Sequence, residues 1–363
     1  MTLRPSPVRP LIALLAVAGA AVAAPTASAA PGPFSPSVLS VEQNDTPVDG
    51  WGSWLVWSRR EADGRYALVA RGPDGTGLRL PIAPQGAPID ASIGPGPAGT
   101  AVVAYALCAK QTGRTPTGCD VRLLDLATGE DRAVPAASDP AVDERHPAVW
   151  GTRIAFSRPR SAKRPQRAGI AIADLAATAP VAPTVFGPRT EKQGRRRVAV
   201  PAYAPHGIDL VGTTLAATWQ TSGRGAERWR LLVRRGSGSP RTVVSATTNR
   251  RTLSRLGRPA LTATEVVVPR QRTGRTSRSD IVRTTLDGRR AWTLGSGFTA
   301  AQTERYGSAL SAVARTAGDG LVVVRRLASD GRWSCKHPLL PDARGCELLA
   351  LDAATQPWRR TRR

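Results

Sequence analysis

The sequence predicts an all-β chain that folds as a six-bladed β-propeller of four-stranded antiparallel blades. Two cysteines, Cys108 and Cys119, recur as Cys335 and Cys346 at one constant offset, so two distant segments repeat one structural unit. Short β-branched or aromatic runs also recur along the chain, with starts 47 to 62 residues apart. Helical periodicity is weak, and 35 Gly and 31 Pro leave little room for long helices. Repeats of this length with strand-like content indicate a propeller.

Each repeat is expected to begin with an inner strand and a tight turn that leads into a second strand. The six second strands are predicted at Trp54–Ser58, Ala101–Tyr105, Arg153–Ser157, Leu215–Gln220, Glu265–Pro269 and Leu321–Arg325. Third strands are predicted across a longer loop, at Ala67–Arg71, Val121–Leu126, Gly169–Leu175, Arg230–Arg234, Asp280–Leu286 and Glu347–Ala353. Turn formers such as Asp74-Gly75 then lead into a fourth, edge strand. A seven-bladed ring that uses the N-terminal segment is the alternative.

Three segments carry a resemblance to a known family. The run His146–Ser157 (HPAVWGTRIAFS) resembles the strand-turn-strand pattern of TolB-type six-bladed β-propellers. Val69–Thr76 and Arg283–Gly288 are similar to the third strand and acidic-glycine turn of that family. The resemblance covers residues 44 to 357 in pattern, and it implies a propeller that binds in its central channel or on one face. It does not transfer a reaction, because propellers host many functions.

The N-terminus has the features of a secretory signal. Residues 1–29 contain Arg4 and Arg9, an apolar stretch and a small-residue cleavage site, Ala27-Ser28-Ala29. An uncleaved anchor is the alternative, and no later segment is apolar enough for a transmembrane helix. Residues 30–43 are expected to form an N-terminal segment whose Val38–Val41 could close the ring as an edge strand beside Pro357–Arg360. Residues 44–360 are expected to form one propeller domain.

The four cysteines indicate in which cellular compartment the protein folds. Two identically spaced pairs in an exported chain predict two disulfides, Cys108–Cys119 and Cys335–Cys346, formed in an oxidising environment. Metal binding is the weaker interpretation, because His337 is the only other candidate ligand in either ten-residue gap. We therefore expect a secreted or cell-wall-associated protein. We also expect a monomer that is not an integral membrane protein.

The charge of the chain is strongly basic and unevenly placed. The net charge is +24, and it falls to +22 when Arg4 and Arg9 leave with the signal. Basic residues concentrate in the loops expected on one face of blades three to five. The predicted anion-binding set is Arg158, Arg160, Lys163, Arg164, Arg167, Arg195, Arg196, Arg197, Arg250, Arg251, Arg270, Arg272 and Arg275. The sequence also places Arg255 and Arg258 in these loops, and it predicts a neutral or mildly acidic opposite face. The alternative is that these loops are simply solvated.

A possible reactive centre involves histidine. His146 and His206 lie near the starts of inner strands in adjacent repeats, with Asp143 close in sequence, so all three are channel candidates. The two histidines are one position out of register, and period-two geometry predicts that they point to opposite sides of their strands. No catalytic, metal or cofactor motif is present, so no catalytic residue, metal or cofactor is predicted.

The sequence therefore predicts a binding protein rather than an enzyme. Its expected partner is an anionic polymer, either a wall polymer or an acidic polysaccharide, or an acidic protein. One alternative is a lyase or hydrolase that acts on an acidic polysaccharide in the central channel. A buried carboxylate–histidine cluster would favour that alternative. The other alternative is a structural scaffold of the envelope, which predicts an exposed apolar patch.

Overall fold

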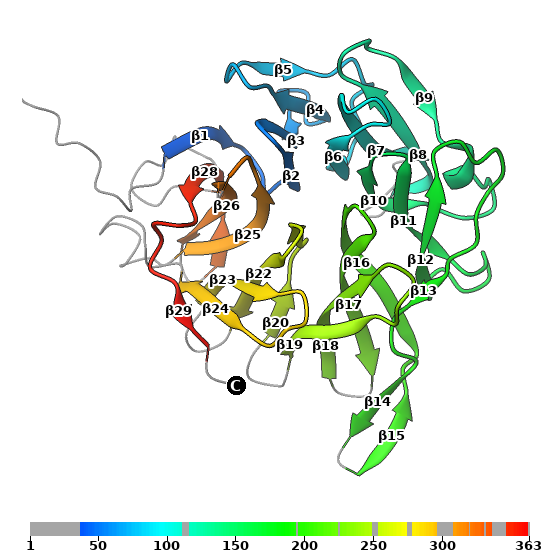
Figure 1. Cartoon of the computed structure of the whole chain (residues 1–363), viewed down its shortest axis with the longest axis vertical. Helices are drawn as coiled ribbons and strands as arrows, with labels where there is room; N and C mark the ends of the chain where they lie inside the picture. The colour runs from blue at the N-terminus through cyan, green and yellow to red at the C-terminus, as the bar shows by residue number, and fades with distance from the viewer. Residues whose placement is uncertain are drawn as a thin grey trace, which may run out of the picture. The chain divides into compact units, whose positions relative to one another are not determined.

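Six small antiparallel sheets, arranged as the blades of a ring, make up the fold (Figure 1). The computed structural model describes residues 37–110, 116–193, 195–223, 226–248, 253–273, 278–295, 308–318, 320–329, 332–335 and 346–361. The predicted all-β, six-bladed architecture is confirmed, and the one helical element among these residues is the short 3-10 turn η1 (Pro135–Ala137). Within this part of the chain, no helix has the length and apolar character needed to cross a membrane.

Blades one to five run from an inner strand to an outer strand in chain order, whereas blade six takes its outer strand from the N-terminal end of the described chain. Blade one contains β2 (Val48–Trp51), β3 (Trp54–Arg60), β4 (Tyr66–Arg71) and β5 (Gly77–Arg79). Blade two contains β6 (Ala91–Pro95), β7 (Ala101–Lys110), β8 (Thr117–Asp125) and β9 (Asp131–Ala133). Blade three contains β10 (Arg145–Trp150), β11 (Arg153–Pro159), β12 (Ala168–Asp174) and β13 (Val185–Phe186).

The second half of the ring contains an extra hairpin and extra short strands besides the four strands of each blade. Blade four contains β16 (Ala202–Val211), β17 (Thr214–Gly223), β18 (Ala226–Arg235) and β19 (Arg241–Thr247), and a separate hairpin of β14 (Thr190–Gln193) and β15 (Arg196–Ala199) precedes it. Blade five contains β20 (Leu253–Leu256), β21 (Ala260–Leu261), β22 (Glu265–Thr273), β23 (Arg278–Thr285) and β24 (Ala291–Gly295). Blade six contains β25 (Ser308–Arg315), β26 (Gly320–Ser329), β27 (Arg332–Ser334) and β28 (Cys346–Asp352).

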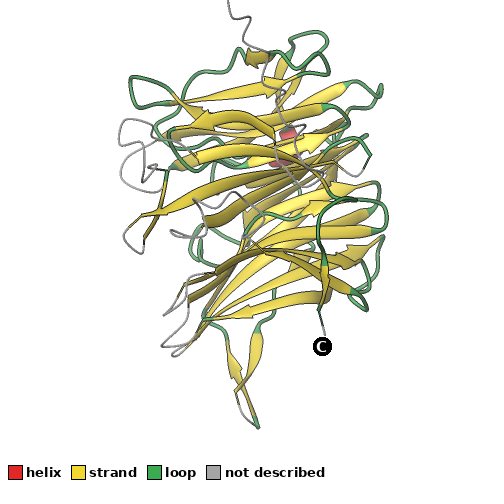
Figure 2. Cartoon of the chain, turned by 90° about the vertical axis from the view of Figure 1, so that its left-hand side faces the viewer, coloured by secondary structure: helices red, strands yellow, loops and turns green. Residues whose placement is uncertain are grey.

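Tight turns link the first two strands of several blades, as the sequence predicts. Gly151 and Gly212 occupy these turns with φ angles of 61° and 57°, in the left-handed region that glycine adopts without steric cost. We call the side of the ring with these turns the turn face. The opposite side, where inner strands begin and the longer connections between second and third strands lie, is the loop face. Figure 2 shows the strands edge-on between these two sides.

The hydrophobic core lies between neighbouring blades rather than at the centre of the ring. Six clusters of buried side chains fill the six seams, and the last of them joins blade six to blade one. Trp57, Trp219 and Trp229 belong to these seams and are at most 5% exposed. Sheet-on-sheet packing of this kind leaves the inner strand edges facing the channel, where polar side chains can gather.

Both ends of the described chain join outer strands. Strand β1 (Ser37–Glu42) pairs antiparallel with β28 and so forms the outer strand of blade six. The C-terminal strand β29 (Arg359–Arg360) pairs with β24 of blade five instead of lying beside β1. The expected neighbour of the closing strand was therefore wrong, because β28 itself offers the free edge that β1 occupies.

Both predicted disulfides are present. Cys108 and Cys119 form one bond, Cys335 and Cys346 form the other, and no free cysteine remains among the described residues. The first bond joins directly paired residues of β7 and β8 on the loop face. Two such bonds indicate an oxidising environment. The predicted signal segment, residues 1–29, lies outside the described residues.

Candidate functional site

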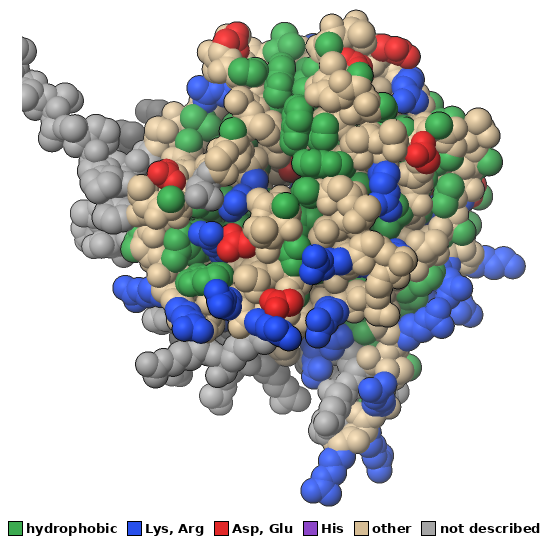
Figure 3. All heavy atoms as spheres, in the orientation of Figure 1, with side chains coloured by type: hydrophobic (Ala, Val, Ile, Leu, Met, Phe, Trp, Pro, Cys, Tyr) green, Lys and Arg blue, Asp and Glu red, His purple; other side chains and the backbone are tan. Residues whose placement is uncertain are grey.

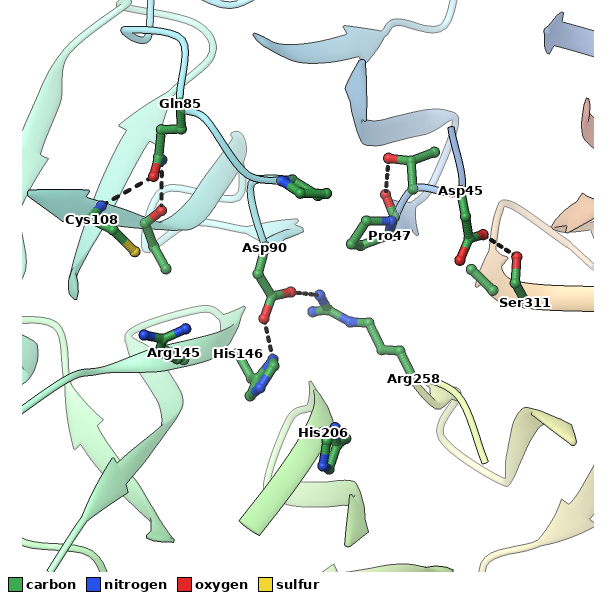
Figure 4. Close-up of a pocket in the computed structure, with 14 residues that line it drawn as sticks. Asp45, Pro47, Gln85, Asp90, Cys108, Arg145, His146, His206, Arg258 and Ser311 are labelled. Atoms are coloured by element: carbon green, nitrogen blue, oxygen red, sulfur yellow. Dashed lines mark hydrogen bonds and ion pairs between the residues drawn. The ribbon is translucent and has the colours of Figure 1, made fainter. Parts of the chain in front are cut away.

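A cavity of about 310 Å³ lies at the centre of the loop face (Figure 4). Its polar lining comes from all six blades or the connections that precede them. The residues that matter for its chemistry are Gln85, Asp90, Arg145, His146, His206, Arg258 and Ser311. A cavity with a few convergent polar groups is the usual form of a ligand site.

Four of these residues share one structural origin, an interruption of an inner strand. His146 lies where the pairing of β10 with β11 shifts register, and His206 lies at the register shift of β16. Ser311 occupies the corresponding shift in β25. Arg258 lies in the gap between β20 and β21, which both pair with β22. A bulge turns the side chain of its extra residue out of the regular alternation, so these four side chains converge on the channel.

The expectation that the two histidines point to opposite sides was therefore wrong. Their ring centroids are 6.4 Å apart, and both rings line the cavity. Period-two alternation fails here because each histidine is itself the irregular residue of its strand. His146 has a φ of 52°, and among the described residues it is the only non-glycine with a positive φ. Such backbone strain is concentrated at functional sites.

Asp90 holds His146 in place. The Oδ2 atom of Asp90 contacts Nδ1 of His146, and Oδ1 accepts a 3.0 Å hydrogen bond from Nη1 of Arg258. Burial opposes ionisation of Asp90, but the charges of His146 and Arg258 outweigh it and lower the pKa of this carboxyl. Because Nδ1 is engaged, Nε2 is the His146 nitrogen that remains for a ligand or a proton in the cavity.

His206 has a different environment. Its ring packs against Trp229 at 4.6 Å, centroid to centroid, with the ring planes tilted by 50°, and it remains open to the cavity. The surrounding protein disfavours a charged imidazole, and His146 adds repulsion, so the pKa of His206 is lowered. The site therefore pairs a carboxylate-bound histidine with a histidine that favours the neutral form. Such a pair can accept hydrogen bonds from one ligand and donate hydrogen bonds to it.

Arg258 forms the floor of the cavity and is only 7% exposed. Its guanidinium donates to the carbonyl oxygens of Ala91 at 2.6 Å and Pro147 at 3.0 Å, as well as to Asp90. The sequence places Arg258 with the exposed basic loops, and this prediction was wrong. The long side chain enters the channel and joins blades two, three and five, because fixed carbonyl and carboxylate acceptors replace its hydration.

Two further carboxyls lie beneath the floor. Asp49 accepts a 3.1 Å hydrogen bond from the Ile93 amide, and Asp209 accepts one of 2.7 Å from the Leu210 amide. Burial raises the pKa of both groups, and the charge of Asp49 contributes to raising that of Asp209 to about 7. Attraction to Arg258 opposes the shift at both carboxyls. The floor can therefore hold a proton at neutral pH.

Asp143 does not line the cavity, although the sequence suggests it as a channel candidate. Its Oδ1 accepts hydrogen bonds from the amides of Gly118 at 2.7 Å and Cys119 at 3.1 Å, and its Oδ2 lies 3.3 Å from Arg145. It therefore stabilises the disulfide-bonded connection of blade two. Asp90 supplies the carboxylate of the site instead, from a connection in which no motif marks it.

The predicted anion-binding set contains both exposed and buried residues. Exposed members on the loop-face connections are Arg160, Lys163, Arg164, Arg195, Arg196, Arg197 and Arg272. Two members are largely buried: Arg158 pairs with Asp139 and lies 3.5 Å from Glu144, and Arg270 pairs with Asp280. Arg167 is half-buried and donates to the Pro201 carbonyl. Arg250, Arg251 and Arg275 lie outside the described residues.

Comparison with known proteins extends only to the fold. No protein-family model matches the chain, and no curated protein matches its sequence. Among solved structures, puromycin hydrolase is similar with a TM-score of 0.49 and 13% identity, over 88% of this chain and 54% of that chain. The chain thus spans about half the length of that enzyme. The six-bladed fucose-binding lectin of Aleuria aurantia has a TM-score of 0.47 and 10% identity, covering 80% of this chain and 94% of the lectin. An ulvan lyase of family PL25 has a TM-score of 0.44 and 8% identity, over 90% of this chain and 95% of the lyase. The resemblance to TolB-type propellers stays a prediction.

Proposed function

We propose that this chain is a secreted binding protein for an anionic polysaccharide or wall polymer. One unit of the polymer enters the central cavity, and the neighbouring units contact the exposed arginines of blades three to five. The observation that carries the proposal is the convergence of four bulged side chains on a cavity that opens on the same face as those arginines.

The chemistry of the cavity supports a polar, acidic unit as ligand. The volume of about 310 Å³ fits a small organic group, and the neutral imidazole of His206 can hydrogen-bond a ligand. The Gln85 amide instead bonds backbone groups of blade two, and the Ser311 hydroxyl donates to Asp45. Arg145 adds a positive charge at the wall, although Asp143 neutralises part of it. The hydroxyls of a sugar match the neutral imidazole of His206, and a carboxylate, sulfate or phosphate matches the guanidinium of Arg145.

The rim supports a polymer rather than a single sugar. The β14–β15 hairpin forms a separate two-stranded sheet next to blade four, and exposed Arg195, Arg196 and Arg197 lie at and beside its turn. Arg160 and Arg189 both lie against the ring of Phe186, at 4.8 and 5.9 Å from its centroid. Several cations spread over a wide surface bind a repeating polyanion better than a small ion.

The test is binding of the mature protein to wall teichoic acid, an acidic polysaccharide and a neutral glucan, at about 50 and about 300 mM salt. We expect binding to the anionic polymers only, weaker at high salt, and largely lost when Arg195, Arg196 and Arg197 become Ser. The matched control changes Arg60, Arg65 and Arg71 of blade one to Ser, which removes the same charge elsewhere. Equal loss in both variants, or binding to the neutral glucan alone, contradicts the proposal.

A second candidate function is acid–base chemistry on the same polymer, as a lyase or hydrolase. The Asp90–His146 pair favours it, because a carboxylate that orients an imidazole is the usual arrangement of a general base. The assay incubates each anionic polymer with the protein and follows chain shortening and unsaturated products. Cleavage that His146→Gln abolishes while polymer binding persists would establish an enzyme; uncleaved polymer leaves the binding function alone.

A further inference from the structure

A second cavity lies on the turn face, at the seam between blades four and five. Its volume is about 430 Å³, and it is separate from the central cavity. Arg235 ends β18 on one side, Thr264 belongs to the first turn of blade five, and the segment Thr285–Arg290 forms the turn between β23 and β24. In Figure 3, Lys and Arg side chains gather over the lower half of the view, where Figure 1 places these two blades.

The lining has an excess of positive charge. Three guanidinium groups, those of Arg235, Arg289 and Arg290, stand against the single carboxylate of Asp287. Asp287 accepts hydrogen bonds from the Thr285 hydroxyl at 2.7 Å and the Arg289 amide at 2.9 Å, and its pKa is lowered by them. Arg289 lies 3.3 Å from the same carboxylate. Within the described chain, Arg235 and Arg290 have no carboxylate at ion-pair distance.

The backbone around the cavity is fixed by its own hydrogen bonds. The Leu286 amide donates to the Thr264 carbonyl at 3.3 Å, and the Thr285 amide donates to the Arg290 carbonyl at 3.1 Å. On the other side, the Gly236 amide donates to the Thr213 carbonyl at 3.0 Å. The positions from which Arg235 and Arg290 project are therefore set before any ligand arrives, which lowers the entropy cost of binding.

We propose that this cavity binds a tetrahedral oxyanion, a phosphate or sulfate group, between Arg235 and Arg290. Both guanidinium groups can offer two parallel N–H donors to such a group. The anion is either free in solution or an ester on a polymer, since the recognised chemistry is the same. This site lies on the face opposite the central cavity, so it is independent of the polymer binding proposed above.

Calorimetric titration of the mature protein with inorganic sulfate, inorganic phosphate and dextran sulfate at constant ionic strength tests the site. We expect the double substitution Arg235→Ser and Arg290→Ser to weaken binding of the simple anions about 10-fold or more. Arg241→Ser, an exposed arginine at the start of β19, is the control and should change binding by less than about 2-fold. Asp287→Asn should strengthen binding several-fold, because it releases Arg289 from its carboxylate partner.

The outcomes separate the sources of the anion. Binding of the simple ions without displacement by dextran sulfate supports a site for free anions, whereas displacement of bound inorganic sulfate by dextran sulfate supports a site for polymer esters. Absence of sulfate and phosphate binding to the native protein overturns the proposal, and so does a loss in Arg241→Ser equal to that of the double variant. Because both variants keep Arg195, Arg196 and Arg197, failure here leaves the loop-face proposal intact.

Discussion

Among single residues, Glu144 links stability most directly to pH. Its side chain is fully buried, and the nearest cation is Arg158, whose Nε lies 3.5 Å from Oε1. Burial raises the pKa of Glu144 to about 8 in spite of the attraction to Arg158, and Asp120 and Asp139 add repulsion. In the unfolded chain this carboxyl returns to its ordinary pKa of 4.5. Between these two values the folded protein binds a proton that the unfolded chain releases.

The free energy of unfolding should therefore fall as pH rises toward 8, by at most about 1.4 kcal/mol per pH unit for this group. His206 acts in the opposite sense, but only below pH 6.5, because its pKa is lowered from that value. Asp209, whose pKa is raised to about 7, lowers stability in the same sense over part of the range from pH 6.5 to 8, so the effect of Glu144 is the difference between the thermal melts of the native protein and of Glu144→Gln. Glu144→Gln should flatten the pH dependence and raise the melting temperature at pH 8.

The control for this measurement is Glu130→Gln, which alters an exposed carboxyl in a turn of blade two. It should leave the slope unchanged. A native protein whose melting temperature rises between pH 6.5 and 8, or a Glu144→Gln variant with the native slope, would show that Glu144 is ionised in the folded state.

Of the candidate site, only the histidines were predictable from the sequence, because histidine is rare in this chain and its side chain suits acid–base and metal chemistry. The chain has three histidines, and two of them, His146 and His206, were candidates because of their residue type and position. Asp90 and Arg258 meet across 168 residues, within connections that have no periodic pattern, so no local signal identifies them. The strand irregularities that turn Arg258 and the two histidines inward also leave no mark in a sequence pattern of strict alternation.

Among the elements, β1 has the largest effect on closure of the ring. It adds the outer strand to blade six, and Glu42 at its end accepts a 2.8 Å hydrogen bond from Nε1 of Trp57 in blade one. The same carboxylate pairs with Arg59 at 3.0 Å. This one strand therefore connects the last blade to the first, through its backbone on one side and a buried carboxylate on the other.

A chain that begins at Asn44 lacks β1 and should be less stable by several kcal/mol. At roughly 2 °C per kcal/mol for a domain of this size, its melting temperature should fall by roughly 5–10 °C. Differential scanning calorimetry provides the measurement, and a chain that begins at Ser37 and retains β1 is the control. If both chains melt together, the ring is closed by the seam between blades six and one alone.

The elements themselves were largely predictable from the sequence. All six predicted second strands coincide with β3, β7, β11, β17, β22 and β26, because apolar alternation and glycine turns are local signals. The β14–β15 hairpin escaped prediction, since its residues are mostly polar and basic and no apolar face marks it as a strand pair. The pairing of β29 with blade five escaped as well, because register between distant strands depends on which edge is free.

On the scale of the whole molecule, positive charge is distributed differently inside and outside. The buried arginines are paired, as Arg258 is with Asp90 and Arg158 with Asp139. Exposed arginines on the loop face of blades three to five, and those of the second cavity on the turn face, outnumber the acids near them. The predicted neutral character of the turn face therefore holds for turns of blades one to three and fails at blade five.

This distribution predicts that salt stabilises the free protein. Mutual repulsion among exposed cations is screened by added ions, whereas ion pairs at the buried floor are screened much less. Raising NaCl from about 20 to about 200 mM should increase the melting temperature by several degrees. Replacing Arg195, Arg196 and Arg197 with Ser should raise the melting temperature at low salt and reduce the salt effect, because it removes three charges from the repelling set. A melting temperature that falls with NaCl would instead mean that surface ion pairs such as Arg79–Glu61 dominate the electrostatic stability.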